Sequence, residues 1–163
     1  MLNIGFIGGG GIARHHAARL TQIKGARILA VSDVIAAAAN SFASDFGAEY
    51  HTTDYRRMLD LPDLDAVWVC TPTFQHPAPV IAAAKAGKHV FCEKPMALNL
   101  PDARRMLRAC EQANVRLTIG FVRRFDSQWG KLKQIVQWDL DVDMSKEEQA
   151  SDWGAKELTQ SQL

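Results

Sequence analysis

Short apolar runs alternate with helix-like segments along most of the chain. The apolar runs are continuous rather than alternating in polarity, which is typical of parallel strands covered on both faces. They predict strands at Asn3–Ile7, Arg27–Ser32, Ala66–Cys70, His89–Cys92 and Arg116–Ile119, with a weaker one near Glu49–His51. The segments between them predict helices at Ile12–Gln22, Ala36–Phe46, Pro77–Ala86 and Pro101–Gln112. This rhythm predicts an α/β fold with a doubly wound parallel sheet and right-handed crossovers.

The pattern changes after Phe125. Residues 127–138 form a helical pattern with one apolar face, made of Trp129, Leu132, Ile135 and Val136. Residues 139–163 hold seven acidic and two basic residues and few apolar anchors. We therefore predict a nucleotide-binding domain at residues 1–126, followed by a helix and an acidic tail at residues 127–163.

Composition excludes some classes of function. A net charge of +1 gives no footprint for nucleic acid, and no apolar run approaches the length of a membrane span. The three cysteines lie in strand-like or helix-like runs and indicate reduced core residues, so a cytoplasmic location is the expectation. The amino terminus runs directly into a strand pattern without the features of a signal peptide. We predict no metal site.

A glycine-rich turn follows the first predicted strand. Only one alignment fits the pattern G-x-G-x-x-G/A, and it uses Gly8, Gly10 and Ala13. Gly8 would make the tight turn, Gly10 would let a pyrophosphate approach the backbone, and Ala13 would let the helix lie close to the strand. N–H groups at the start of that helix, around Ile12, would face the phosphates. The alternative is a glycine turn that only packs.

The second predicted strand ends at Asp33, 20 residues after Ala13. A carboxylate there can accept hydrogen bonds from both hydroxyls of an adenosine ribose, and it would repel a 2′-phosphate. NAD is therefore favoured over NADP. Asp33 also suits the cap of the next helix, and both roles can hold together.

Polar residues follow two later strands at the same edge of the sheet. Glu93 and Lys94 leave the strand His89–Cys92, and a lysine beside a nicotinamide can hydrogen-bond a substrate hydroxyl and assist proton transfer. The alternative for this pair is a surface ion pair. The other strand leads into Thr71, Thr73 and His76, of which the last two also suit a helix start.

Five segments together resemble the glucose–fructose oxidoreductase, inositol 2-dehydrogenase and rhizopine-catabolism (Gfo/Idh/MocA) family: GFIGGGGIA, the strand-end Asp33, TPTFQH, HVFCEKPMAL and GFVRRFD. The resemblance implies NAD(P)-dependent oxidation of a hydroxyl on a sugar, polyol or inositol. It implies that Lys94 is catalytic, that Glu93 lies near the cofactor, and that Pro95 follows a cis peptide bond. It places Thr71, Thr73 and His76 on the nicotinamide side.

The resemblance also implies a substrate contact for Arg124, which otherwise belongs to a solvated basic pair. Family members continue into a second α/β domain that supplies an Asp and a His to the catalytic group. This sequence follows the family to about Gln137 and then becomes the acidic tail. Two functions are open: the cofactor-binding half of an oxidoreductase, weak or inactive alone, or a non-catalytic module that binds a dinucleotide or a partner, with a homodimer possible through Trp129, Trp138 and Trp153.

Overall fold

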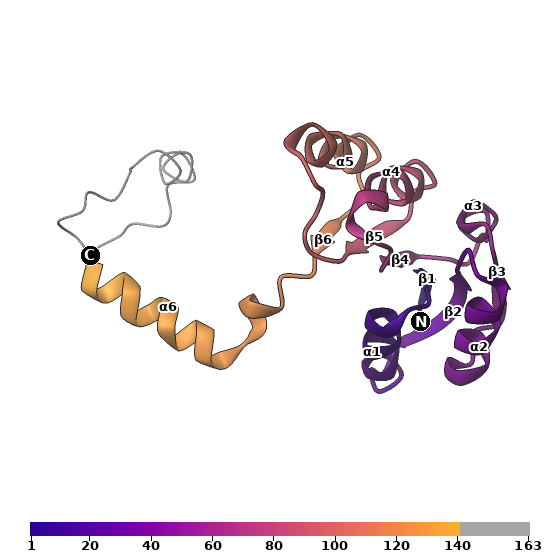
Figure 1. The fold of residues 1–163 in the computed structure, drawn as a ribbon, viewed down its shortest axis with the longest axis horizontal. Coiled ribbons are helices and arrows are strands. Elements are labelled where there is room, and N and C mark those ends of the chain that lie inside the picture. The colour runs from indigo at the N-terminus through magenta and orange to yellow at the C-terminus, as the bar shows by residue number, and fades with distance from the viewer. Residues whose placement is uncertain (141–163) are drawn as a thin grey trace. The chain divides into compact units, whose positions relative to one another are not determined.

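The structure of the protein is a computed structural model that describes residues 1–140. The chain forms two compact units, Met1–Phe121 and Val122–Leu163. The first unit contains the whole sheet (Figure 1). The functional division after residue 126 stays a prediction.

The sheet has six parallel strands in the spatial order β3-β2-β1-β4-β5-β6. The predicted α/β class and doubly wound parallel sheet are therefore confirmed. The connections of β1 and β4 leave the sheet in opposite directions, and such a switch point opens a crevice beyond the carboxyl ends of the strands. The strands are β1 (Leu2–Ile7), β2 (Ala26–Ser32), β3 (Tyr50–Thr52), β4 (Ala66–Val69), β5 (His89–Cys92) and β6 (Leu117–Ile119).

Successive side chains along a strand point to opposite faces of the sheet. The sheet therefore has an apolar cluster on each face. Ile4 and Phe6 of β1 point to the face covered by α1 (Gly11–Leu20) and α2 (Ala36–Phe46), where Phe42 is fully buried. The other face packs against α3 (Tyr55–Leu59), α4 (Pro77–Lys85) and α5 (Leu100–Gln112). Figure 1 shows α1 and α2 on one side and α4 and α5 on the other.

The helix boundaries follow from local chemistry. Pro77 occupies the first turn of α4, and Gly87 follows that helix with φ +72°, a backbone conformation that favours glycine. The Asn99 side chain caps α5 by accepting from the Asp102 N–H at 2.9 Å. The sequence pattern missed α3, because its five residues are too few to show a helical period; the Asp54 side chain caps it.

The second unit begins with a 3-10 helix, Val122–Phe125, and continues as α6, Ser127–Leu140. The predicted helix over residues 127–138 is thus present. Asp126 caps it by accepting from the N–H of Gln128 at 2.9 Å. The guanidinium of Arg123 lies 4.6 Å from the centre of the Trp129 ring, a cation–π contact. The predicted tail from residue 141 onward lies outside the described residues.

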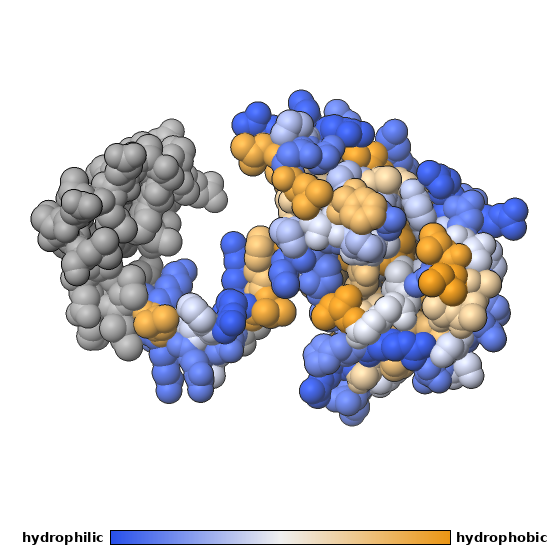
Figure 2. Space-filling model, viewed as in Figure 1, coloured by the Kyte–Doolittle hydropathy of each residue, from blue (hydrophilic) through white to orange (hydrophobic). Residues whose placement is uncertain are grey.

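Several large apolar side chains of the described residues are exposed. In Figure 2 the hydrophobic residues of the first unit form small separate patches between hydrophilic ones. Single exposed apolar residues are normal in a globular protein. Among residues 1–140, every helix is too short or too polar to cross a bilayer.

Candidate functional site

Four strand exits lie in register at one edge of the sheet. The first residue after each strand donates its backbone N–H to a carbonyl on the neighbouring strand: Gly8 to Ser32 at 2.7 Å, Cys70 to Ile7 at 2.8 Å, Glu93 to Val69 at 3.0 Å and Gly120 to Cys92 at 2.9 Å. The segments that follow β1, β4, β5 and β6 therefore begin side by side.

The glycine turn after β1 depends on missing side chains. Gly8 has φ +94°, and a Cβ there would lie 2.9 Å from the carbonyl oxygen of Cys70. A Cβ on Gly10 would meet nothing within 4 Å, so the backbone there faces open space. Ala13, in the first turn of α1, is completely buried on the face that packs against the sheet. These are the conformations that the glycine fingerprint requires of the three positions.

The amino terminus of α1 points its N–H groups out of the turn. Its N-cap is Gly10, which has no side chain to satisfy them, and its first turn, which includes Ile12, contains no acidic residue. Such a terminus attracts anions through its free N–H groups and the helix dipole. Ile12, predicted to contact the cofactor, lies in this turn and is about half exposed.

Asp33 joins the glycine turn to the start of α2. Its Oδ2 accepts from the Gly9 N–H at 2.8 Å, and its Oδ1 accepts from the Ile35 N–H at 2.9 Å. The second contact is a turn just before α2, whose N-cap is Ile35 without a side-chain cap, so the expected cap of this helix by Asp33 is not formed. Each carboxylate oxygen keeps a further lone pair, so the predicted ribose contact is compatible with both bonds. The ribose contact itself stays a prediction.

A pocket of about 610 Å³ lies beside the glycine turn. The predicted residues Gly8, Gly10, Asp33 and Thr71 line it. The exposed apolar side chains of Val34 and Phe74 also contribute to its wall. Mostly apolar walls with a few fixed polar groups are typical of cofactor sites.

Three observations indicate that the pocket fits a dinucleotide. Gly10 leaves open space next to a helix amino terminus. The Asp33 carboxylate is fixed at the wall. The Thr71 hydroxyl oxygen is buried and has no hydrogen-bond partner among the described residues, although buried polar groups are nearly always paired. Gly10, the start of α1 and Asp33 would hold the pyrophosphate and an adenosine ribose, and the unpaired hydroxyl of Thr71 lies buried in the wall of the same pocket.

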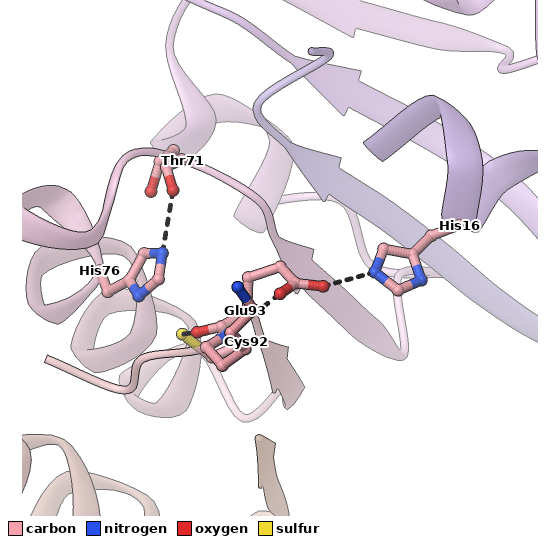
Figure 3. Close-up of polar contacts among 6 residues, drawn as sticks. His16, Thr71, His76, Cys92 and Glu93 are labelled. Carbon is pink, nitrogen blue, oxygen red and sulfur yellow. Dashed lines mark hydrogen bonds and ion pairs between the residues drawn. The ribbon is translucent and has the colours of Figure 1, made fainter. Parts of the chain in front are cut away.

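His76 does not line this pocket. Its side chain is 1% exposed, and its Nε2 lies 2.9 Å from the Thr71 carbonyl oxygen. Its Nδ1 lies 3.0 Å from the carbonyl oxygen of Pro95 and 3.3 Å from that of Met96. Figure 3 shows the ring turned toward Thr71. His76 therefore ties the segment after β4 to the segment after β5, while Thr73 begins the short 3-10 helix Thr73–Gln75.

Glu93 is 7% exposed, and both of its carboxylate oxygens are engaged. Oε1 lies 2.6 Å from Nε2 of His16 on α1, and Oε2 accepts from the Lys94 backbone N–H at 3.0 Å. Figure 3 shows His16 reaching Glu93 from α1. Glu93 thus turns inward from the strand end, whereas the Lys94 side chain is exposed. The Lys94–Pro95 peptide bond is cis, as the resemblance implies.

Sequence analysis missed His16, although a signal for it exists. His16 follows Ala13 by three residues and precedes Leu20 by four, so it lies on the buried face of α1. Its neighbour His15 is exposed. Helical spacing alone separates a histidine that faces the sheet from one that faces solvent.

Arg124, predicted to contact substrate, lies in the 3-10 helix of the second unit. Its contact with a substrate stays a prediction. Among the described residues, no group of three or more His, Cys, Asp or Glu side chains could hold a metal ion.

Two buried thiols lie at the strand ends of the site. Burial, with the nearby charge of Glu93 in second place, raises the pKa of Cys92 to about 12. The same two causes raise the pKa of Cys70 well above its usual range. Both thiols are neutral near pH 7, which excludes a thiolate nucleophile at this edge.

A family model described as an oxidoreductase family with an NAD-binding Rossmann fold matches residues 2–121. This match covers the entire sheet and all the strand exits described above. The chain belongs to the Gfo/Idh/MocA oxidoreductase family. The family suggested by the sequence motifs is thereby confirmed, and so is NAD as the cofactor of the domain.

Relatives within the Gfo/Idh/MocA family include dehydrogenases of inositols. The myo-inositol 2-dehydrogenase of Thermotoga maritima is 43% identical over 136 residues, which are 83% of this chain and 41% of the relative. The crystal structure of a probable dehydrogenase from Thermotoga maritima gives a TM-score of 0.79 at 44% identity, over 83% of this chain and 41% of that one. The scyllo-inositol dehydrogenase of Lactobacillus casei, solved with NAD(H) and scyllo-inositol, gives 0.78 at 31% identity, over 85% and 41%. The chain therefore spans about 41% of the length of these family members.

Proposed function

We propose that this chain is the cofactor-binding half of an NAD-dependent oxidoreductase that acts on a hydroxyl group of a sugar, polyol or inositol. The observation that carries the proposal is the convergence of two features at one sheet edge. The exit from β1 forms a cradle for a dinucleotide, and the exit from β5 delivers Lys94 to the same edge. The inositol dehydrogenases among the relatives support the substrate class.

Each residue would have a distinct task. The turn Gly8–Gly10 and the amino terminus of α1 would bind the pyrophosphate, and Asp33 would bind the adenosine ribose and disfavour a 2′-phosphate. When bound, NAD supplies the acceptor for a hydride from the substrate carbon.

Lys94 would bind the substrate hydroxyl. Its exposed ammonium group is able to donate a hydrogen bond to that oxygen and to stabilise the negative charge that develops when the proton leaves. Glu93 holds the Lys94 backbone from inside the protein. Thr71, which lines the pocket, would contact the cofactor on its nicotinamide side. The three cysteines are buried and unpaired with one another, which favours a reducing, cytoplasmic location.

The second candidate is a module that binds NAD without chemistry. It is favoured by the pocket lining, which includes Gly8, Gly10 and Asp33 but not Lys94. In that case the chain would not use general acid–base catalysis, which is typically worth about 10²–10⁴-fold. The Lys94 side chain would then have no chemical role.

Calorimetric titration of the purified chain with NAD, NADH and NADP, followed by a turnover assay with inositols and simple aldoses, tests both candidates. The matched variants are Lys94→Ala and Lys85→Ala, the latter an exposed lysine at the far end of α4. NADH formation that is lost only in Lys94→Ala supports the oxidoreductase. NAD binding without turnover, equal in all three proteins, supports the binding module. A folded chain that binds none of the dinucleotides contradicts both.

A further inference from the structure

The Glu93 carboxylate connects two segments that are 77 residues apart in the chain. It is nearly buried, and a buried carboxylate requires hydrogen-bond partners to offset the loss of water. One oxygen takes its partner from α1 and the other from the segment that leaves β5. The carboxylate therefore links the helix behind the glycine turn to the backbone of Lys94.

Packing fixes the orientation of the His16 ring. The ring lies edge-on against Phe91, with centroids 5.3 Å apart and planes at 70°, and Phe91 in turn stacks on Trp68 at 5.0 Å. Gly120 closes the other side of this space, because a Cβ there would lie 3.0 Å from the Phe91 ring and 3.3 Å from Glu93 Oε1. The histidine thus presents Nε2 to the carboxylate from a well-packed position.

We propose that His16 is a positioning residue for Lys94, acting through Glu93. The lysine side chain is exposed, so its ammonium group is aimed mainly by the backbone from which it starts. The Glu93 carboxylate holds the Lys94 N–H, and His16 holds the carboxylate. A displacement of this backbone moves the lysine relative to the cofactor crevice, and small errors in position reduce rates strongly.

The hydrogen-exchange rate of the Lys94 backbone amide, measured by NMR in the whole protein, tests the linked contacts of His16, Glu93 and Lys94 directly. His16→Phe keeps a ring against Phe91 but removes the nitrogen that reaches Glu93. We expect the Lys94 amide to exchange about tenfold faster, as when one hydrogen bond to a charged group is weakened. His16→Gln restores a side-chain N–H and should recover most of the protection. Arg19→Ala, at an exposed position on the same helix, should change nothing.

The amide of Val67 in the centre of the sheet reports global stability in the same spectra. Equal acceleration at Val67 and Lys94 would show a general loss of stability and overturn the positioning role. Unchanged exchange at Lys94 in His16→Phe would overturn it as well.

The functional consequence rests on the proposed function of Lys94 and has its own readout. His16 does not line the pocket, so we expect NADH affinity in His16→Phe to stay within about twofold of the parent, less than one hydrogen bond contributes. If the parent chain turns over substrate, kcat should fall while KM holds. Failure of the parent to bind NADH would contradict the proposed function, whereas the exchange experiment would still decide the role of His16.

Discussion

The turn Gly8–Gly10 and the segment Glu93–Met96 lie at the same sheet edge but are held by different kinds of contact. The turn is shaped by what is missing, since Gly8 has no room for a Cβ and Gly10 faces open space. The segment after β5 is held by two histidines from other elements, His16 through Glu93 and His76 through two backbone carbonyls. The turn side of the crevice is therefore specified mainly by backbone conformation, with one bond from the Gly9 N–H to Asp33, and the other side by distant side chains.

This difference separates stability from binding in the glycine turn. Gly8 has a role in folding, because its positive φ and its contact with Cys70 exclude a side chain even without a ligand. Gly10 has a role only when a ligand arrives, because the free protein has space for a Cβ there. In the segment after β5, both histidine contacts hold the protein itself and are present before any ligand arrives.

Substitution of the two glycines by alanine gives the largest expected contrast. Gly8→Ala should lower the free energy of unfolding by about 3 kcal/mol, from backbone strain together with the clash against Cys70. Gly10→Ala should leave stability within about 0.5 kcal/mol and weaken NADH binding about tenfold, because the Cβ keeps the pyrophosphate from a backbone N–H. Denaturant unfolding and calorimetry measure the two effects. Equal loss of stability in both variants would contradict the distinction.

Replacement of His76 tests whether the segment Glu93–Met96 is held by side chains from other elements. His76→Phe keeps a ring in the buried site and removes the ring N–H that faces backbone carbonyl oxygens, so we expect a loss of about 2 kcal/mol in unfolding free energy. The exposed His15→Phe is the matched control and should change stability by less than about 0.5 kcal/mol. A loss in His76→Phe no larger than in the control would show that the ring only fills space.

The same contrast explains how much the sequence could predict. The parallel sheet followed from continuous apolar runs, and the glycine turn followed from a local motif in which Gly8, Gly10 and Ala13 are close together in the chain. Contacts between distant segments leave no such local pattern. The pairing of His16 with Glu93 requires knowing that α1 crosses the end of β5.

His76 illustrates a second limit of sequence reasoning. A histidine near a strand end has the same appearance in the sequence whether it faces a ligand or backbone carbonyls. The structure places it against the carbonyls of Thr71, Pro95 and Met96, where its burial shows a supporting role for two loops. The predicted place of His76 on the nicotinamide side stays a prediction. The short helix α3 escaped prediction for a simpler reason, because a single turn has no period.

Asp33 lies beside the turn Gly8–Gly10 but acts through its side chain. Its replacement therefore tests whether a side chain also contributes to binding on this side of the crevice. Asp33→Ser removes the carboxylate, and we expect the Kd for NAD to rise about tenfold while NADP binding improves relative to NAD. Calorimetry with both dinucleotides measures the ratio. An equal loss for NAD and NADP would mean that Asp33 acts only by holding the Gly9 and Ile35 N–H groups.

The smallest expected effect is a loss of unfolding free energy at alkaline pH, which comes from the buried thiol of Cys92 at the end of β5. Burial raises the pKa of Cys92 from near 9 to about 12, so the folded state favours the neutral thiol. That contribution is complete below the unfolded pKa near 9 and is lost as the pH rises toward 12, because only the unfolded chain ionises in this window. At pH 10 the loss is about 1 kcal/mol for one thiol. Comparison of unfolding free energies at pH 8 and pH 10 in the parent and in Cys92→Ala isolates this thiol, since other groups titrate in both proteins. The decline should be about 1 kcal/mol smaller in the variant, and an identical decline would show that the buried Cys92 ionises as readily in the folded chain as in the unfolded one.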